Sequence, residues 1–197
     1  MLKGNSKLLR TIFAAMFLAI ALVLPFLTGQ IPMFGKMLCP MHIPVLLCGF
    51  FCGPWLGAAV GIIAPIFRSL IFGMPQLFPE GIAMCFELCT YGLIAGSLYN
   101  FLPKKPIFVY VSLIGAMLTG RAVWGIVRVI LYGVAHVPFG WMAFLSSAFL
   151  KAFPGIVLQI ILIPILVIAL RKPFLRLNSA DEKTNTKSKA NNVKDRN

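Results

Sequence analysis

Two arginines and a tryptophan share one face of a predicted helix. Arg121, Trp124 and Arg128 stand at i, i+3 and i+7 in an apolar stretch of the 197-residue chain, a spacing that aligns side chains on an α-helix. A guanidinium grips a carboxylate or a phosphate through two parallel hydrogen bonds. Beside the indole of Trp124, such a group suits a small organic anion that also has an apolar part.

A second helical face carries acidic groups. Glu80, Glu87 and Tyr91 stand at i, i+7 and i+11, so they too lie along one side of a helix. Two interpretations stay open. The two carboxylates form ion pairs with the arginines of a neighbouring helix, as buried charges tend to, or Glu87 and Tyr91 contact a ligand together with those arginines.

The composition indicates that a membrane surrounds these residues. Hydrophobic residues make up 59% of the chain and charged residues 12%, which is too apolar for a soluble domain. Most of the net charge of +13 lies in the first ten residues, in one short loop and in the C-terminal tail. This distribution follows the positive-inside rule and predicts the lipid bilayer, not nucleic acid, as the surrounding partner.

Cations outnumber carboxylates within or beside the apolar stretches. A charged side chain costs roughly 3 kcal/mol or more in a bilayer, so it usually faces the bundle interior or a polar cavity. If both carboxylates pair with arginines, two cations remain, and a carboxylate or phosphate of a ligand is their natural partner. The charged residues concerned are Arg68, Arg121, Arg128, Lys151, Glu80 and Glu87.

Further polar candidates lie at the ends of the apolar stretches. Met41 and His42 stand at the entrance of one stretch, and Gln159 is embedded in the last. A lone histidine is more often a satisfied polar residue than a ligand contact, and a buried glutamine serves either a helix-to-helix hydrogen bond or a ligand. The connecting segment MPQLFP, residues 74–79, adds Gln76 and Phe78.

The cysteines and the missing motifs argue against metal binding and catalysis. Cys48 and Cys52, like Cys85 and Cys89, stand four residues apart, but no CxxC or paired-histidine spacing accompanies them. We therefore interpret them as small buried hydrophobes and predict no metal site and no cofactor. The chain has no nucleophile elbow, HExxH or P-loop, so we expect no enzyme, and any ATPase must be another protein.

Hydrophobic runs predict an all-α integral membrane protein with six transmembrane helices. Each long run is sufficient to cross about 30 Å of hydrocarbon. The basic N-terminus 1–10, the LPKKP loop at 102–106 and the polar tail 173–197 place both termini in the cytoplasm. The membrane domain is 11–172, the tail is predicted to be disordered, and the expected spans are 8–28, 42–51, 55–73, 80–101, 107–132 and 146–170.

Small residues recur four apart at two positions. Gly57 and Gly61 predict close helix packing within the bundle. Ala15 and Ala19 form the same small-xxx-small step in the first span, where it serves either ordinary packing within the chain or the approach of a helix from another protein.

Several motifs together resemble the substrate-binding S-components of energy-coupling factor (ECF) vitamin transporters, of the riboflavin, pantothenate and pyrimidine type. The resemblance extends over residues 8–172 and rests on the order of six short spans and a Pro/Gly-rich first loop. The motifs are AMFLA at 15–19, MHIPVLLCGFFCGP at 41–54, ELCTYGLIAG at 87–96, GRAVWG at 120–125 and PGIVLQ at 154–159.

This resemblance implies a membrane-embedded subunit that captures a vitamin or precursor outside the bacterial cytoplasmic membrane. The subunit is expected to dock through Ala15 and Ala19 on an ECF transmembrane coupling subunit that carries two ATPase subunits. By the same resemblance, the site lies in the external half of the bundle. It maps onto Met41, His42, Gln76, Phe78, Glu87, Tyr91, Arg121, Trp124, Arg128 and Gln159.

Pantothenate is the first choice of substrate, because the surplus arginines favour an acidic ligand. Riboflavin, hydroxymethylpyrimidine, pyridoxine and a queuosine precursor stay open. Metal-carrying members of the family use an N-terminal Met-His, whereas here the pair is internal, at residues 41 and 42. The alternative functions are a stand-alone carrier or channel subunit for a small organic solute, and an intramembrane enzyme, for which only two embedded acids and two histidines are available.

Overall fold

The computed structural model describes residues 4–27, 40–103, 105–134 and 153–170, and every regular element in these ranges is helical. The predicted all-α fold is therefore confirmed. The elements are α1 (Gly4–Leu27), α3 (His42–Cys52), α4 (Pro54–Phe72), the π-helical turn η1 (Leu77–Gly81), α5 (Ile82–Phe101), α6 (Pro106–Val134) and a last helix, Phe153–Leu170.

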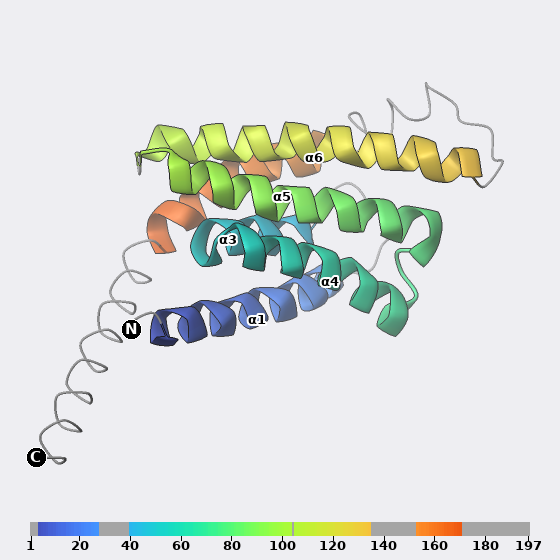
Figure 1. The fold of residues 1–197 in the computed structure, drawn as a ribbon, viewed down its shortest axis with the longest axis horizontal. Coiled ribbons are helices and arrows are strands. Elements are labelled where there is room, and N and C mark those ends of the chain that lie inside the picture. The colour runs from blue at the N-terminus through green and yellow to red at the C-terminus, as the bar shows by residue number, and fades with distance from the viewer. Residues whose placement is uncertain (1–3, 28–39, 104, 135–152, 171–197) are drawn as a thin grey trace, which may run out of the picture.

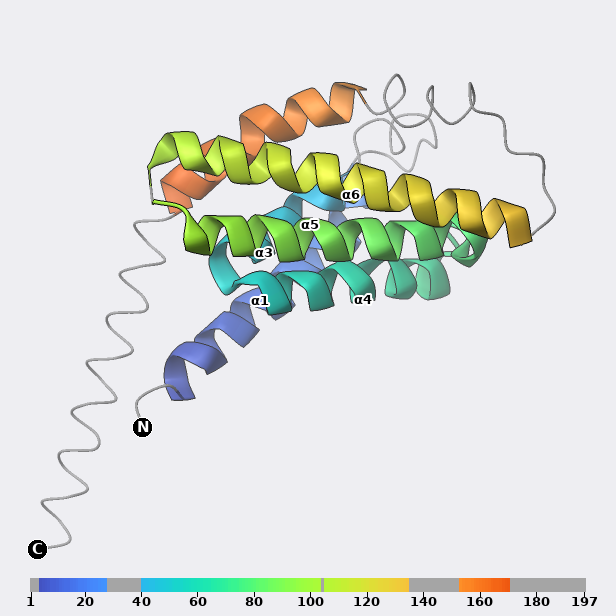
Figure 2. The same cartoon turned by 45° about the horizontal axis from the view of Figure 1, so that its top comes forward.

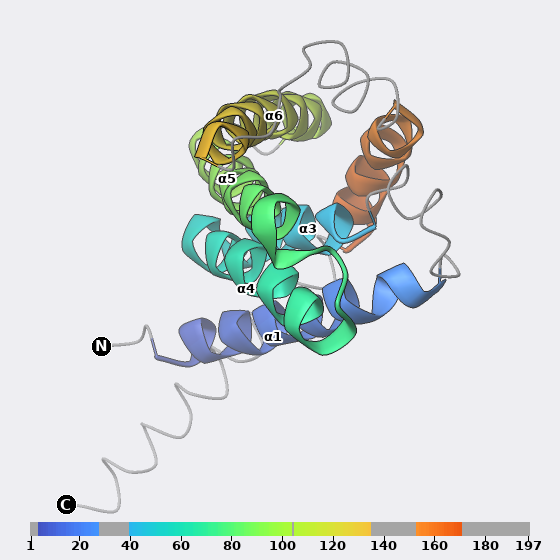
Figure 3. The same cartoon turned by 90° about the vertical axis from the view of Figure 1, so that its right-hand side faces the viewer.

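Helix α5 is the centre of the bundle. It packs against α3, α4 and α6, while α1 packs against α3 and α4 (Figures 1 and 3). Helix α3 is enclosed, since ten of its eleven residues are buried. The last helix lies beside α3 on the side away from α4, as the end-on view shows (Figure 3). Any side chain on α3 or on the inner face of α5 is thus held away from the lipid.

Five of the described helices are long and apolar enough to cross a membrane, and α3 is not. At 1.5 Å per residue its 11 residues extend about 17 Å, roughly half of the hydrocarbon thickness. Among the described residues, the six predicted spans therefore correspond to five long helices and one short, buried helix, which is the short second span expected at 42–51. Bulky apolar side chains such as Leu70, Leu118 and Ile126 are exposed on the outer faces of the long helices, where lipid would cover them.

The helix ends are sorted between the two ends of the bundle. The start of α1, the α3–α4 turn, the α5–α6 connection and the end of the last helix lie together, and the α4–α5 connection lies at the opposite end (Figures 1 and 2). This arrangement fits the predicted topology, in which both termini are on one side. Their cytoplasmic orientation stays a prediction.

Two turns follow from proline and glycine. At the α3–α4 turn, Gly53 has φ 99°, a left-handed conformation that favours glycine, and Pro54 opens α4. The sequence Cys-Gly-Pro at 52–54 predicts a tight turn here, and the structure confirms it. Between α4 and α5 the predicted link 74–79 is partly helical, because η1 includes Leu77–Gly81 and α5 begins only at Ile82. Phe78, which precedes Pro79, is extended, as a residue before proline prefers.

Glycines close the junction of α3, α4 and α5. A Cβ atom on Gly92 would collide with the backbone of Gly57, and one on Gly61 with the carbonyl of Leu88. A Cβ on Gly49 would lie 2.7 Å from the carbonyl oxygen of Gly92. The backbones of the three helices therefore touch directly, and the close packing predicted at Gly57 and Gly61 is confirmed. We call this junction the glycine seam.

Some sequence predictions fall outside the described residues. They concern residues 29–39 of the Pro/Gly-rich first loop, residues 135–141 of the external loop expected at 133–141 between the fifth and sixth spans, the start of the sixth span at 146–152 with Lys151, and the tail 173–197.

Candidate binding site

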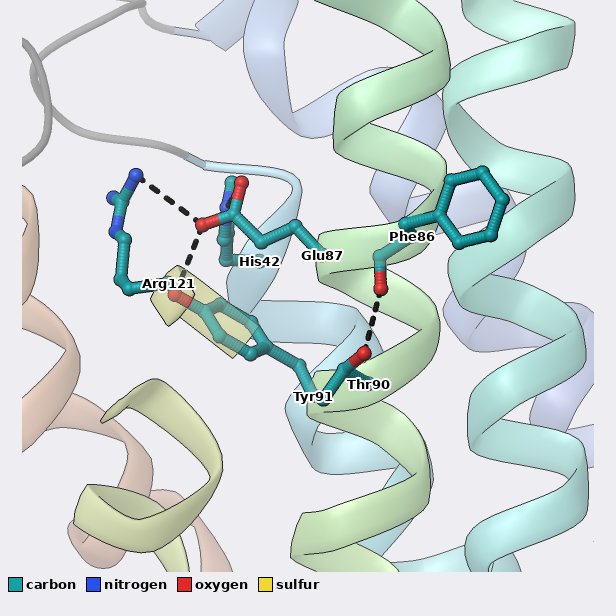
Figure 4. A network of polar contacts seen from close by, with 6 residues as sticks. All are labelled: His42, Phe86, Glu87, Thr90, Tyr91 and Arg121. Atoms are coloured by element: carbon teal, nitrogen blue, oxygen red, sulfur yellow. Dashed lines mark hydrogen bonds and ion pairs between the residues drawn. The ribbon is translucent and has the colours of Figure 1, made fainter. Parts of the chain in front are cut away.

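Three polar side chains surround the carboxylate of Glu87 in the middle of the bundle. Nη1 of Arg121 lies 3.2 Å from Oε1 of Glu87, and the hydroxyl of Tyr91 donates to the same oxygen at 3.0 Å. The other oxygen, Oε2, lies 3.6 Å from Nε2 of His42. Figure 4 shows the arrangement. We call His42, Glu87, Tyr91 and Arg121 the buried centre.

Three different helices supply the buried centre. Glu87 and Tyr91 are one turn apart on α5, His42 is the first residue of α3, and Arg121 lies halfway along α6. The imidazole of His42 packs edge-on against the ring of Tyr91, with 5.3 Å between the ring centroids. Residues far apart in the sequence thus form one polar cluster inside an apolar bundle.

The buried centre is almost completely removed from solvent. Glu87 is 1% exposed and His42 2% exposed. A buried carboxylate is tolerable only when it is paired, and Arg121 supplies that pairing. Within the described part of the chain, neither ring nitrogen of His42 has a hydrogen-bond partner. Such groups are rare in folded proteins, so His42 retains a donor and an acceptor for a further molecule.

Gly120 positions Tyr91, a role that the sequence analysis missed. A Cβ atom on Gly120 would collide with the ring of Tyr91. The absent side chain therefore lets the ring lie against the backbone of α6, from where its hydroxyl reaches Glu87. The glycine directly before Arg121 in the GRAVWG motif was the available signal, since glycine marks close approach of backbone and ring.

A second cluster joins η1 to α6. Nη2 of Arg128 lies 2.6 Å from Oε1 of Glu80 and donates to the hydroxyl of Tyr132 at 3.0 Å. The guanidinium lies 4.8 Å from the ring centroid of Trp124. We call Glu80 and Arg128 the outer pair. Trp124 and Tyr132 are its aromatic neighbours. Tyr132 was missed, although its i+4 spacing from Arg128 would have found it.

The two ion pairs determine the charge balance of α6. Arg121 pairs with Glu87 and Arg128 with Glu80, so the predicted helix-to-helix ion pairs form, and a ligand contact of Glu87 in addition to its ion pair stays a prediction. Each arginine of α6 thus faces a carboxylate, and the two cations that remain of the expected four are Arg68 and Lys151, of which Lys151 lies outside the described residues. Trp124 lies between the pairs, with the Arg121 guanidinium 5.7 Å from its ring.

Arg68 is the embedded cation that has no carboxylate partner among the described residues. Its Nη1 donates to the carbonyl of Leu22 at 3.4 Å, which ties α4 to α1. Its guanidinium lies 5.7 Å from the ring of Phe26 and 5.9 Å from that of Phe72. No described contact connects Arg68 to the buried centre.

The remaining predicted site residues are not gathered in one place. Met41 belongs to the apolar core, and Gln159 is buried in the last helix. Gln76 and Phe78 are exposed at the start of η1, and no described contact joins them to the buried centre. Their role as substrate contacts stays a prediction.

The small-residue step of α1 faces outwards. Ala15 and Ala19 are exposed, whereas Ala14 and Phe17 on the other side of the helix are buried in the core. The step is therefore not used for packing within the described part of the chain, and the surface is open to another helix.

The cysteines form no metal centre within the described residues. Cys48 and Cys52 are buried, and all four described cysteines are free thiols. No group of three or more histidine, cysteine or acidic side chains in this part of the chain has metal-binding geometry.

The helical fold agrees with the comparison to known families. The family described as ECF transporter, substrate-specific component, matches residues 9–167. The chain therefore belongs to the substrate-specific components of ECF transporters, as its motifs predicted. Members of this family are substrate-binding transporter subunits and not enzymes, and with five apolar helices of spanning length the chain is a multi-pass membrane protein. No curated protein and no solved structure matches the chain.

Proposed function

We propose that this subunit captures a small water-soluble vitamin or vitamin precursor at the outer face of the bacterial cytoplasmic membrane. The single observation that carries the proposal is His42, which is buried yet has neither ring nitrogen hydrogen-bonded among the described residues. Such a group costs stability, and ligand binding gives a reason to retain it.

The ion pair beside His42 makes the site specific. Glu87 and Arg121 neutralise each other, and Tyr91 fixes one carboxylate oxygen, so the polar atoms hold their positions before a ligand arrives. Pre-organised polar groups in an apolar pocket lower the cost of binding. The vitamins named from the motifs, pantothenate included, are the candidate substrates.

Delivery of the substrate requires an energised partner. We assign this role to an ECF transmembrane coupling subunit with two ATPase subunits, which docks on α1. The exposure of Ala15 and Ala19 supports docking, because small side chains allow the backbone of a second helix to approach closely. The alternative is a stand-alone carrier, which would move substrate without ATP.

The first test identifies the substrate. Small molecules released by denaturing the protein, purified without added ligand, are identified by mass spectrometry, and we expect one vitamin or precursor. The second test measures uptake in cells that express the ECF module. Ala15→Trp and Ala19→Trp should abolish ATP-dependent uptake while ligand binding persists. Leu118→Trp, which places the same tryptophan side chain on the exposed face of α6, serves as the control. Uptake by the purified chain in liposomes without ATP would support the stand-alone carrier.

A further inference from the structure

The charges and the hydrogen-bonding groups of the buried centre favour one class of substrate over another. We propose that the group bound there is uncharged and presents an N–H donor next to a hydrogen-bond acceptor, as in the ring edge of an aminopyrimidine or a ureide, and is not a carboxylate or a phosphate. This inference rests on the proposed function, and it reverses the preference for an anion that the arginine spacing suggested.

Charge balance is the first step. Each arginine of α6 already faces a carboxylate, at 3.2 Å for Arg121 and 2.6 Å for Arg128. An anion placed beside these pairs would add a net negative charge close to Glu87, in a region that is shielded from water. An unbalanced charge is unfavourable in such surroundings, whereas an uncharged ligand leaves the balance unchanged.

The direction of the available hydrogen bonds is the second step. Oε1 of Glu87 accepts a hydrogen bond from Tyr91 and forms the ion pair with Arg121, while Oε2 lies 3.6 Å from Nε2 of His42, beyond hydrogen-bond distance. A carboxylate only accepts, and a neutral imidazole offers one donor and one acceptor. The ligand group that fits here must donate a hydrogen bond to Oε2 of Glu87. It must also donate a hydrogen bond to His42 or accept one from it. Adjacent donor and acceptor atoms on one edge meet both demands.

The position of Arg68 is the third step. An anionic ligand would need a guanidinium that has no carboxylate beside it, and among the three embedded arginines of the described ranges, Arg68, Arg121 and Arg128, that residue is Arg68. It lies between Phe26 and Phe72 at the contact of α1 with α4. That contact is separate from the α3, α5 and α6 side chains that form the buried centre.

A probe panel tests the class directly. Isothermal titration of the full-length protein in detergent would compare two uncharged probes that have the edge, 4-amino-5-hydroxymethyl-2-methylpyrimidine and riboflavin, with two anionic ones, pantothenate and nicotinate. We expect at least one uncharged probe to bind and neither anion to do so. Binding of an anion overturns this inference and leaves the proposed function standing. Binding of none of the four, with no vitamin released from the purified protein, contradicts both.

The substitution Glu87→Gln tests the role of the carboxylate, because it should weaken the binding of an uncharged ligand but strengthen the binding of an anion. Glu87→Gln should weaken binding of the uncharged probe at least tenfold, because the ligand donor loses its charged acceptor. If the substrate were an anion, the same substitution would strengthen binding by removing a repulsive charge, and that result would overturn the inference. Thr90→Val is the matched control, since Thr90 is on the same helix and donates only to the carbonyl of Phe86, away from the centre (Figure 4).

A second variant keeps the test valid if Glu87→Gln lowers stability. His42→Phe retains an aromatic ring but removes both nitrogens, neither of which is hydrogen-bonded within the described structure. We expect an unchanged melting temperature and at least tenfold weaker binding. A lower melting temperature with unchanged affinity would assign His42 a purely structural role and would overturn the inference.

Discussion

The glycine seam and the buried centre are two junctions of the same helix, α5, built in opposite ways. In the seam, backbone touches backbone at Gly92 and Gly61, and no side chain intervenes. In the buried centre, long side chains such as Glu87 and Arg121 span the gap between helices. The glycine seam fixes the position of α5. The buried centre retains polar atoms that can form hydrogen bonds with a ligand.

The two junctions are adjacent along α5. The carbonyl of Leu88, against which Gly61 packs, belongs to the residue directly after Glu87. Displacement of α4 from α5 would therefore also move the carboxylate. We infer from this comparison that the close-packed glycine side of α5 positions its polar side. The following substitutions test this inference.

The largest effect is expected from Gly92→Leu. Because a Cβ atom alone would collide with the backbone of Gly57, a leucine must separate α4 from α5, and we expect no folded protein by size-exclusion chromatography and circular dichroism in detergent. Gly133→Ala is the matched control, since nothing lies within 4 Å of its added Cβ. Its melting temperature should equal or exceed the native one, because alanine favours a helix by about 1 kcal/mol. A folded Gly92→Leu protein would refute direct backbone contact.

Arg121→Ala comes next. It leaves the carboxylate of Glu87 buried without its cation, and breaking a buried pair in this way costs about 3 to 5 kcal/mol. Thermal unfolding should show a large loss, and the double substitution with Glu87→Gln should recover part of it. Additive losses in this double-mutant cycle would mean that the pair is not coupled.

Gly120→Ala should have an intermediate effect. The added Cβ would collide with the ring of Tyr91, so the ring must move and its bond to Glu87 is weakened, at a cost of about 1 to 3 kcal/mol. Ligand affinity should fall more than stability. The control is Gly115→Ala on the same helix, whose Cβ meets only the flexible end of Leu98. Equal behaviour of the two variants would exclude the positioning role of Gly120.

Glu80→Gln should have the smallest effect. The side chain of Glu80 is 38% exposed, and ion pairs of this exposure contribute about 1 kcal/mol or less. We expect a small decrease in melting temperature that shrinks further in high salt. A loss as large as that of Arg121→Ala would show that the outer pair between η1 and α6 stabilises the fold as much as the buried centre does, and would contradict this ranking.

Local spacing predicted much of this structure. The length of the apolar runs located the long helices, and the i, i+3, i+7 pattern placed Arg121, Trp124 and Arg128 on one side of α6. Proline and glycine at Cys52–Pro54 predicted the α3–α4 turn, which the structure confirms. These features depend on residues within a few positions of each other, so one sequence is enough to predict them.

Contacts between residues that are distant in the sequence could not be predicted from residue spacing. Which carboxylate pairs with which arginine depends on the vertical alignment of α5 against α6, and the approach of His42 to Glu87 depends on where α3 begins. The contact between Gly120 and Tyr91 depends on the distance between two helices. Each is set by packing of the whole bundle, which a pattern along one helix does not contain.

The central claim is that the buried centre holds the substrate. The most direct measurement is mass spectrometry of the small molecules released from the native protein and from His42→Phe, both purified in the same way without added ligand. The account predicts that the native protein releases one vitamin or precursor and that the variant, equally folded, releases little or none. Equal amounts of the same molecule from both proteins would contradict it.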